Sequence, residues 1–419
     1  MKYWTAVVEL PRRDGKRRRL PIRSKSKPEV MKQLREMQAQ LAKSGDLETK
    51  SYTVEQWVHE WFTTIAANKN RPKTLDTYAG LIRREIIPAI GRIKLDKLTP
   101  GDVRKMNHAI VAAGKSSTTA KQVHRILAVA LKYAEREGKV ARNVATLIDA
   151  PVKAATNLKA LTLDEGLEVL ETATTDDLGS LWAAVLLMGG RLGELIGLQR
   201  DRVHVDDPAD PDPEHDTLEL AWQLQRYTWE HGCKPEKNPD GAERPSCGRK
   251  RGADCPRRKV TAPPNHEAVN ITGGLWLSRP KTKAGFRVVP LVDPLRAIIL
   301  GHMAATADQP NPHNLVWHKP NGQPIDPRDA NHLWHAILDR AGVTQVRFHD
   351  GRHTAVDLLL LAGVPIDVVQ QIIGHSSRAQ TQEYKTRNSP QNVAAMKAYA
   401  KMLTDRQQKR SGQSELEAS

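Results

Sequence analysis

The chain contains only three cysteines in 419 residues, too few for a disulfide framework. It also lacks long apolar runs: the densest, Leu358–Ile366, is far shorter than the roughly 20 residues of a membrane-spanning helix. At the N-terminus a short apolar run, Trp4–Val8, is followed by a basic cluster and not by the pattern of a secretory signal. We therefore expect a protein of the reducing cytoplasm without a membrane-spanning part.

Positive charge is in excess. Lysine and arginine number 64 against 48 aspartates and glutamates, a formal net charge of +16. A surface of this kind repels itself unless an anionic partner meets it; nucleic acid is the first candidate and an anionic membrane surface the second. A basic soluble protein without such a partner fits the charge as well. The length favours two or three domains, and 39% hydrophobic residues are enough for buried cores.

The first domain is predicted over residues 1–50, which hold 14 lysines and arginines against six acidic residues. Tyr3–Leu10 and Lys16–Arg23 have strand composition, and Asp14-Gly15 between them is typical of a tight hairpin turn. A capping box at Ser26 then opens a helix. A basic sheet with one helix is suited to reading a DNA groove, and a solvated basic appendage is the equal alternative.

Two larger units follow. Residues 51–150 show helical periodicity in four stretches and predict a compact helical domain. Residues 160–405 combine helices with strands at Leu218–Leu224, Leu275–Ser278 and Phe286–Leu291. Residues 150–161 form the expected linker, 227–266 an irregular insertion, and 406–419 a polar tail.

Five short segments of the last unit carry side chains that can bind phosphate or transfer protons. Arg191 opens a helix, where backbone N–H groups and the helix dipole favour an anion. Lys281 lies in a segment that predicts the tip of a β-hairpin. His349 and Arg352 are three residues apart and share one face of a helix. The other two segments contain His375, at a helix end, and Tyr384, nine residues later.

Each of these residues alone has an ordinary structural explanation, but their order and spacing together resemble the tyrosine recombinase family, also called phage integrases. Leu360–Pro365 and Ile373-Gly374-His375 strengthen the resemblance, which spans residues 51–400. It implies a multidomain, mainly α fold with a mixed α/β (α+β) catalytic domain over 160–405. It further implies a SAM-like helical core-binding domain over 51–150 and an arm-type DNA-binding domain over 1–50.

The resemblance implies a site-specific recombinase that cuts and rejoins DNA through a 3′-phosphotyrosine, for integration or excision of a phage or mobile element. Tyr384 would attack phosphorus and conserve the bond energy, so rejoining needs no ATP and no cofactor. Arg191 and Arg352 would bind the non-bridging oxygens, because arginine offers paired donors and keeps its charge. The helpers would be His349 as base, Lys281 as acid for the leaving 5′ oxygen, His375 as a donor to phosphate, and Glu194 as an acceptor that holds the arginine and histidine side chains.

The implied partners are double-stranded attachment-site DNA and three further copies of the chain, in a tetramer on two sites at the nucleoid of a bacterial host. A directionality factor or DNA-bending protein stays open as a further partner. A helix over Pro390–Leu403 is expected to pack on its own domain or to dock on a neighbouring protomer, as such segments often do in the resembling family.

Two glycines depart from the family pattern. Gly190 precedes Arg191 and Gly351 precedes Arg352 where the family usually has leucine. Neither position ionises, so the expected difference is in packing and not in chemistry.

The insertion holds all three cysteines. His231, Cys233, Cys247 and Cys255 could supply a tetrahedral structural zinc site, although no Cys-x-x-Cys pair is present. A flexible basic insertion with incidental cysteines is the alternative.

Three rival functions remain open at this stage. A type IB topoisomerase would use the same chemistry as a monomer, and the arm-like segment argues against it. A DNA-binding regulator that has lost catalysis would show a broken set of reactive residues, whereas here all six are present. A zinc-dependent nucleic-acid module is disfavoured by the cysteine spacing.

Overall fold

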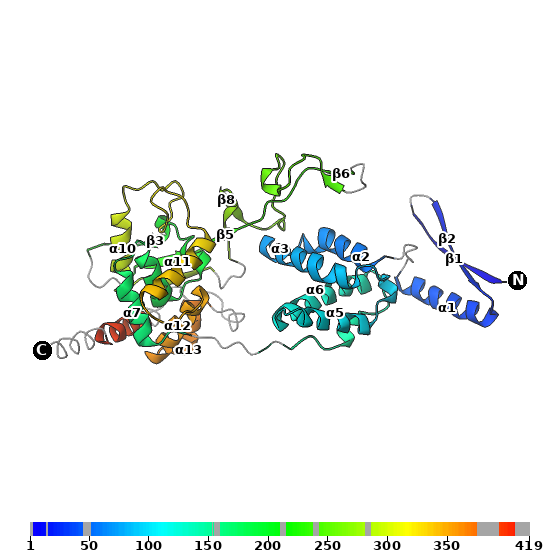
Figure 1. Cartoon of the computed structure of the whole chain (residues 1–419), viewed down its shortest axis with the longest axis horizontal. Coiled ribbons are helices and arrows are strands. Elements are labelled where there is room, and N and C mark those ends of the chain that lie inside the picture. Colours follow the sequence, from blue (N-terminus) through cyan, green and yellow to red (C-terminus); the bar gives the residue numbers. More distant parts are fainter. Residues whose placement is uncertain are drawn as a thin grey trace. The chain divides into compact units, whose positions relative to one another are not determined.

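The computed structural model of the chain describes residues 3–13, 16–44, 52–152, 154, 160–209, 215–237, 243–280, 286–374 and 394–406. These residues fall into two compact units, Met1–Thr156 with Thr261–Pro264, and Asn157–Val260 with Asn265–Ser419 (Figure 1). Three separate hydrophobic clusters stabilise the chain, two in the first unit and one in the second. The fold is therefore multidomain, mainly α-helical, with small sheets, as predicted. No helix among the described residues is both long and apolar enough to cross a membrane.

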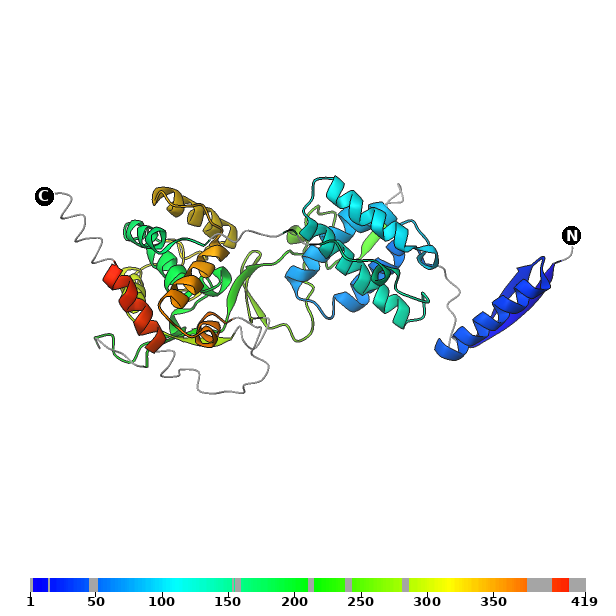
Figure 2. The ribbon, with the colours of Figure 1, turned by 90° about the horizontal axis from the view of Figure 1, so that it is seen from below.

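The N-terminal segment is a two-stranded antiparallel ribbon with one helix. β1 (Trp4–Arg13) pairs with β2 (Lys16–Ser24), and α1 (Lys27–Ser44) lies along one face of the ribbon (Figure 2). Val8, Leu10, Ile22 and Val30 form its small core. The predicted two strands and helix are confirmed; the Asp14-Gly15 turn lies outside the described residues.

The helical segment is built from four helical stretches, as its periodicity predicts. Thr53 and Thr99 each form a capping box, so the helices α2 and α5 begin at the residues predicted from the sequence. The elements are α2 (Val54–Trp61) continued by η1 (Phe62–Ala66), α3 (Pro72–Leu81) continued by η2 (Ile82–Ile86) and α4 (Ile87–Ile90), η3 (Leu95–Lys97), α5 (Pro100–Ala112), α6 (Ser117–Arg136) and η4 (Val144–Leu147).

Helices form most of the second unit, around α8, in which all ten residues are buried. Trp182 of α8 packs against Trp334 and Phe348 with ring centroids 5.7 and 6.3 Å away. The helices are α7 (Leu163–Ala173), α8 (Gly179–Met188), α9 (Leu192–Leu195), η5 (Arg200–Arg202), η6 (Gly252–Asp254), α10 (Leu295–Ala305), α11 (Pro327–Arg340), α12 (Phe348–Leu361) and α13 (Ile366–Ile373).

The strands of this unit form three small sheets. One has the order β10-β4-β3, another β5-β9-β8, and β6 pairs with β7 inside the insertion. The strand predicted over Leu218–Leu224 is thus two strands in different sheets. The bounds are β3 (Val203–His204), β4 (Thr217–Leu220), β5 (Gln223–Arg226), β6 (Pro235–Lys237), β7 (Glu243–Pro245), β8 (Ala268–Thr272), β9 (Leu275–Ser278) and β10 (Arg287–Pro290).

The predicted β-hairpin around residue 281 is wrong. β9 and β10 do not pair with each other: Ser278 lies opposite Gln223, and Arg287 lies opposite Leu220. β10 pairs with β4, whereas β9 pairs with β5 and β8, so the two strands do not form the two arms of a hairpin. The expected tip, residues 281–285, lies outside the described residues.

Two further expectations need correction. Leu161, assigned to the linker, belongs to the core of the second unit: it is buried, and its N–H donates to Thr354 Oγ1 at 2.9 Å. The insertion, expected to be irregular, contains the antiparallel β6–β7 pair and the turn η6. Residues 155–159 of the expected linker and residues 407–419 of the expected tail lie outside the described residues.

The last described helix, residues 394–406, packs on its own unit (red in Figures 1 and 2). Met396, Tyr399 and Leu403 join the hydrophobic core of the second unit, and the Tyr399 hydroxyl donates to the Leu186 carbonyl at 2.8 Å. Arg406 pairs with Asp164 at 2.9 Å. Of the two expected arrangements, the structure shows packing within the chain.

Candidate active site

Arg191 is fixed at the start of α9 by Glu194. The Glu194 carboxylate accepts hydrogen bonds from the Arg191 backbone N–H at 3.1 Å and from its guanidinium at 2.6 Å. A second guanidinium nitrogen donates to the Gly374 carbonyl at 2.8 Å. The side chain keeps 36% of its surface exposed, so one face of the group can meet a ligand.

Arg352 lies deeper, on α12. It is 1% exposed and donates to the carbonyls of Gly189 and Ile373. These carbonyls end α8 and α13, so one guanidinium joins the ends of two helices beside Arg191 and Gly374. The sequence motifs around Arg191, Arg352 and Gly374, far apart along the chain, therefore meet at one place.

A third arginine, Arg287 of β10, joins this cluster. It donates to the second Glu194 oxygen at 3.0 Å and to the Ile372 carbonyl at 3.0 Å. Sequence reasoning gave it no role. Its role follows from the burial of Glu194, which is 2% exposed, because a buried carboxylate needs compensating charge; that burial is visible only in the fold.

The cluster has more positive than negative charge. Arg191, Arg287 and Arg352 surround the single carboxylate of Glu194, and Arg287 Nη1 and Arg352 Nε are buried donors with no hydrogen-bond partner among the described residues. Burial, and then the charges of Arg191 and Arg287, lower the pKa of Arg352 to about 9, which still leaves it charged at neutral pH. Such a site favours an anion, and arginine binds phosphate oxygens with paired donors.

Glu194 stays ionised in this setting. Burial alone would raise the pKa of its carboxyl group, but Arg287 and Arg191 together bring the pKa below its ordinary value. The carboxylate thus holds both guanidinium groups in place at neutral pH. No histidine contacts it among the described residues; its expected hold on a histidine stays a prediction.

His349 stands one turn before Arg352 on α12 and is exposed. Its ring lies 5.4 Å from the ring of His353, centroid to centroid. Partial desolvation, Arg352 and His353 lower the pKa of His349. A ring that is neutral at physiological pH can accept a proton, as a general base must.

Lys281, His375 and Tyr384, the other three predicted residues, lie outside the described residues. For two of them the preceding residue is described. Lys281 follows Pro280 directly, and His375 follows Gly374, whose carbonyl accepts from Arg191.

The two unusual glycines lie in close packing. A Cβ at Gly351 would lie 2.8 Å from Val185 Cγ1 and 3.2 Å from Trp334 Cζ2, and one at Gly190 would lie 2.5 Å from Leu195 Cδ2. The leucine typical of the family does not fit this arrangement. Glycine here lets α8 approach the catalytic helix α12.

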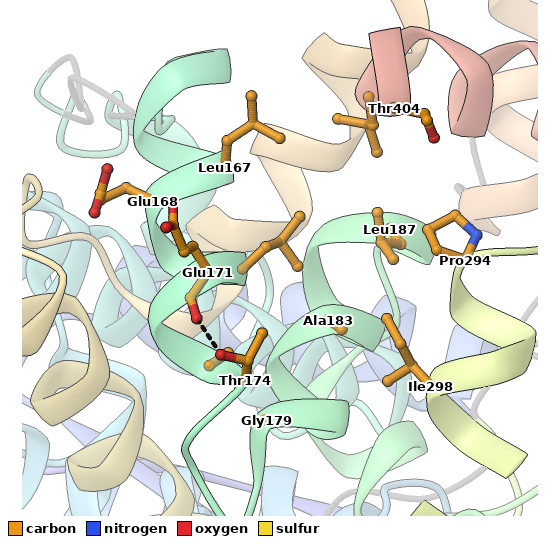
Figure 3. A pocket seen from close by; sticks show the side chains of 13 residues that line it. Leu167, Glu168, Glu171, Thr174, Gly179, Ala183, Leu187, Pro294, Ile298 and Thr404 are labelled. Carbon is orange, nitrogen blue, oxygen red and sulfur yellow. Dashed lines mark hydrogen bonds between the residues drawn. The ribbon is translucent and has the colours of Figure 1, made fainter. Parts of the chain in front are cut away.

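A pocket of the second unit lies away from this cluster. It has a volume of 580 Å³ and lies between α7, α8, α10 and the helix over 394–406 (Figure 3). Leu167, Leu187 and Ile298 are among the residues that line it. The hydrogen bond shown in Figure 3 runs from the Thr174 hydroxyl to the Glu171 carbonyl at the end of α7. None of the candidate catalytic residues among those described lines it.

The cysteine-bearing insertion brings its four predicted ligands together. His231, Cys233, Cys247 and Cys255 place one ligand atom each within 4.8 Å of all the others. Burial raises the pKa of the Cys255 thiol, yet backbone N–H groups of Arg257 and Gly232 and the His231 ring bring it down to about 6.

Comparison with known proteins agrees with this architecture. The Phage integrase family matches residues 265–391, and the phage integrase N-terminal SAM-like domain matches residues 53–109. An integrase of Saccharopolyspora erythraea is 31% identical over 404 residues, covering 91% of this chain and 90% of that protein. An integrase of Streptomyces ambofaciens is 25% identical over 370 residues, covering 86% and 82%.

Solved structures share the fold at low identity. The integrase of the Tn1549 transposon, in complex with transposon right-end DNA, superposes with a TM-score of 0.59 at 16% identity, over 83% of this chain and 95% of that one. A lambda integrase tetramer bound to a Holliday junction gives 0.52 at 15% identity, over 90% and 95%.

The fold and the arginine-rich site define a tyrosine recombinase, an enzyme that breaks and rejoins DNA strands. The chain belongs to the phage integrase family of site-specific recombinases.

Proposed function

We propose that this recombinase integrates and excises a phage or mobile element, and that Tyr384 is its nucleophile. The supporting observation is the cluster of Arg191, Arg287 and Arg352, which carries excess positive charge where a phosphodiester would bind. The biological role is proposed by analogy with the two integrases that match most of this chain.

The tyrosines of the catalytic unit support Tyr384 by elimination. That unit contains three: Tyr227, Tyr384 and Tyr399. Tyr227 is 3% exposed and its hydroxyl is hydrogen-bonded to His266, while Tyr399 is 1% exposed and donates to the Leu186 carbonyl. Burial raises the pKa of Tyr399 far above its ordinary value, so its phenol resists deprotonation. Tyr384 is the remaining candidate.

In the proposed reaction the Tyr384 oxygen forms a bond to phosphorus, and the bond from phosphorus to the 5′ oxygen breaks. His349 takes the phenol proton and Lys281 gives a proton to the leaving 5′ oxygen. Arg191 and Arg352 stabilise the negative charge of the five-coordinate phosphorus, with His375 as a further donor. Attack by a 5′ hydroxyl on the phosphotyrosine reverses these steps and rejoins the strand.

We further propose that four protomers assemble on two double-stranded sites. The lambda integrase tetramer on a Holliday junction, which has this fold, supports the arrangement. A directionality factor or DNA-bending protein would act on the same assembly at the host nucleoid.

The test uses a nicked attachment-site duplex, from which the cleaved fragment diffuses away and traps the covalent complex. The intact chain should give a denaturant-resistant protein–DNA adduct, and Tyr384→Phe should bind the duplex equally well without forming one. Tyr399→Phe serves as the matched control and should still form the adduct. An adduct with Tyr384→Phe would refute the assignment.

A further inference from the structure

The insertion between β5 and β8 is folded without a hydrophobic core. Among its described residues from 228 to 266, Cys255 alone is buried. Figure 1 shows this segment projecting from β5 and β8, away from the helices of its unit. So small a unit cannot bury enough apolar surface to offset its ordering entropy and needs another source of stability.

The β6–β7 pair explains why two of the cysteines meet. Pro235 lies opposite Pro245, so continuing the antiparallel register two residues outward places Cys233 opposite Cys247. The Ser246 N–H donates to the Lys234 carbonyl at 3.1 Å, which extends the pairing toward these two residues.

The turn η6 directly precedes Cys255, and the chain then returns beside Glu230. A bridge between Glu230 and Lys259 fixes this return, with N–H to carbonyl distances of 2.8 and 3.0 Å. Two glycines permit it: a Cβ at Gly232 would lie 1.8 Å from the Arg257 carbonyl oxygen, and one at Gly252 would lie 2.1 Å from that of Trp229. Backbone contacts this close indicate one specific conformation.

The ligand atoms have the spacing of a tetrahedral metal site. His231 Nδ1 lies 3.4 Å from Cys247 Sγ and 4.0 Å from Cys233 Sγ, and all four ligand atoms lie within 4.8 Å of one another. Zinc bonds of about 2.3 Å to sulfur and about 2.1 Å to nitrogen, at tetrahedral angles, would separate the ligand atoms by about 3.5 to 3.8 Å.

We propose that Cys233, Cys247 and Cys255, as thiolates, and His231, through Nδ1, bind one structural zinc ion that takes the place of a core in the insertion. Four protein ligands complete the tetrahedron and leave no position for water, so the site is structural and has no part in the strand chemistry. The wide sequence spacing of the ligands is explained by their origin in a β-hairpin and a returning turn.

Metal content is the direct test. The tag-free full-length chain, purified from cells grown with zinc, should contain about one zinc per molecule by elemental mass spectrometry. Cys247→Ser and Cys255→Ser should lose it, whereas His231→Cys should keep it with a fourth thiolate. His332→Ala, which removes an exposed histidine of α11, is the control and should keep it too.

Cobalt exchange reports the ligand type. Cobalt(II) in the intact protein should give strong visible bands and thiolate charge-transfer absorption, both absent from Cys255→Ser. A chelator should open the insertion to trypsin at the basic residues beside Cys247 and Cys255, and zinc should close it again.

Three results would overturn the proposal. The first is a purified chain that contains no zinc and takes up none when zinc is added. The second is full zinc retention by Cys255→Ser. The third is a disulfide between two of the three cysteines in protein purified without oxygen. Equal trypsin cleavage with and without the chelator would refute the structural role of the ion.

Discussion

At the scale of single residues, the site depends on how many cations share one buried carboxylate. Glu194 neutralises part of the charge of Arg191 and Arg287, while Arg352 relies on backbone carbonyls. The positive charge that remains is preorganised before DNA arrives. Preorganised donors of this kind contribute to catalysis because they need no rearrangement when the transition state forms.

Arg287 is a positioning residue, and we expect its loss to act through Glu194. Arg287→Met leaves a buried carboxylate short of charge, which should lower the melting temperature of the catalytic unit by ~5–10 °C. Adding Glu194→Gln should recover part of that loss. Calorimetry on the two variants, with exposed Arg328→Ala as control, checks this; additive losses in the double variant would contradict it.

Arg352 should matter for rate far more than for affinity. We expect Arg352→Ala to slow single-turnover cleavage by ~10²–10³-fold, because a donor to the transition state is lost. Binding should weaken far less, because many other phosphate contacts supply the affinity. Quenched-flow cleavage and gel-shift titration at one salt concentration separate the two effects; equal losses in both would refute the catalytic role.

The proposed role of His349 predicts that the cleavage rate depends on pH. Partial desolvation and the charges of Arg352, His353 and Arg191 lower its pKa, with Asp350 opposing them. If the neutral ring is the base, as proposed, the rate should be constant above this pKa and fall as pH drops through it, with a midpoint below the ordinary value of about 6.5. Cleavage rates at subsaturating DNA report the free enzyme. An unchanged acid limb in His349→Ala would show that another group is the base.

At the scale of elements, helices were predictable from local pattern and strand pairing was not. Thr53 and Thr99 cap helices as the sequence predicts, because capping involves residues three apart. Whether β9 pairs with β5 or β10 depends on residues far away, and the expected hairpin was wrong for that reason. Likewise the Arg191 and Arg352 motifs were visible in the sequence, but the convergence of Arg287 on Glu194 needed the fold.

Gly351 shows how packing overrides helix propensity. In a helix, alanine is normally more stable than glycine by about 1 kcal/mol. At Gly351 we expect alanine to be destabilising instead, by about 1–3 kcal/mol, because Val185 and Trp334 leave no room for the Cβ. At Gly301 of α10, where a Cβ meets nothing within 4 Å, alanine should be stabilising. Thermal melts of the two variants should move in opposite directions; movement in the same direction would contradict this.

At the scale of the whole molecule, we expect the chain to separate recognition of distal DNA sites from the strand chemistry. Residues 1–50 carry a charge excess in a segment with its own small core. Deleting them should spare binding to a short core site but impair recombination that needs a second, distal site. Recombination on full-length and minimal sites at matched salt tests this, and an unchanged yield on full-length sites would show that the segment is an appendage.

The covalent intermediate is the most direct test of the whole account. The chain should be trapped on nicked attachment-site DNA, digested with nuclease and protease, and analysed by mass spectrometry for a peptide that carries a nucleotide. We predict a nucleotide linked through its 3′ phosphate to Tyr384. A nucleotide on any other residue, or linkage through a 5′ phosphate, would contradict the proposed mechanism.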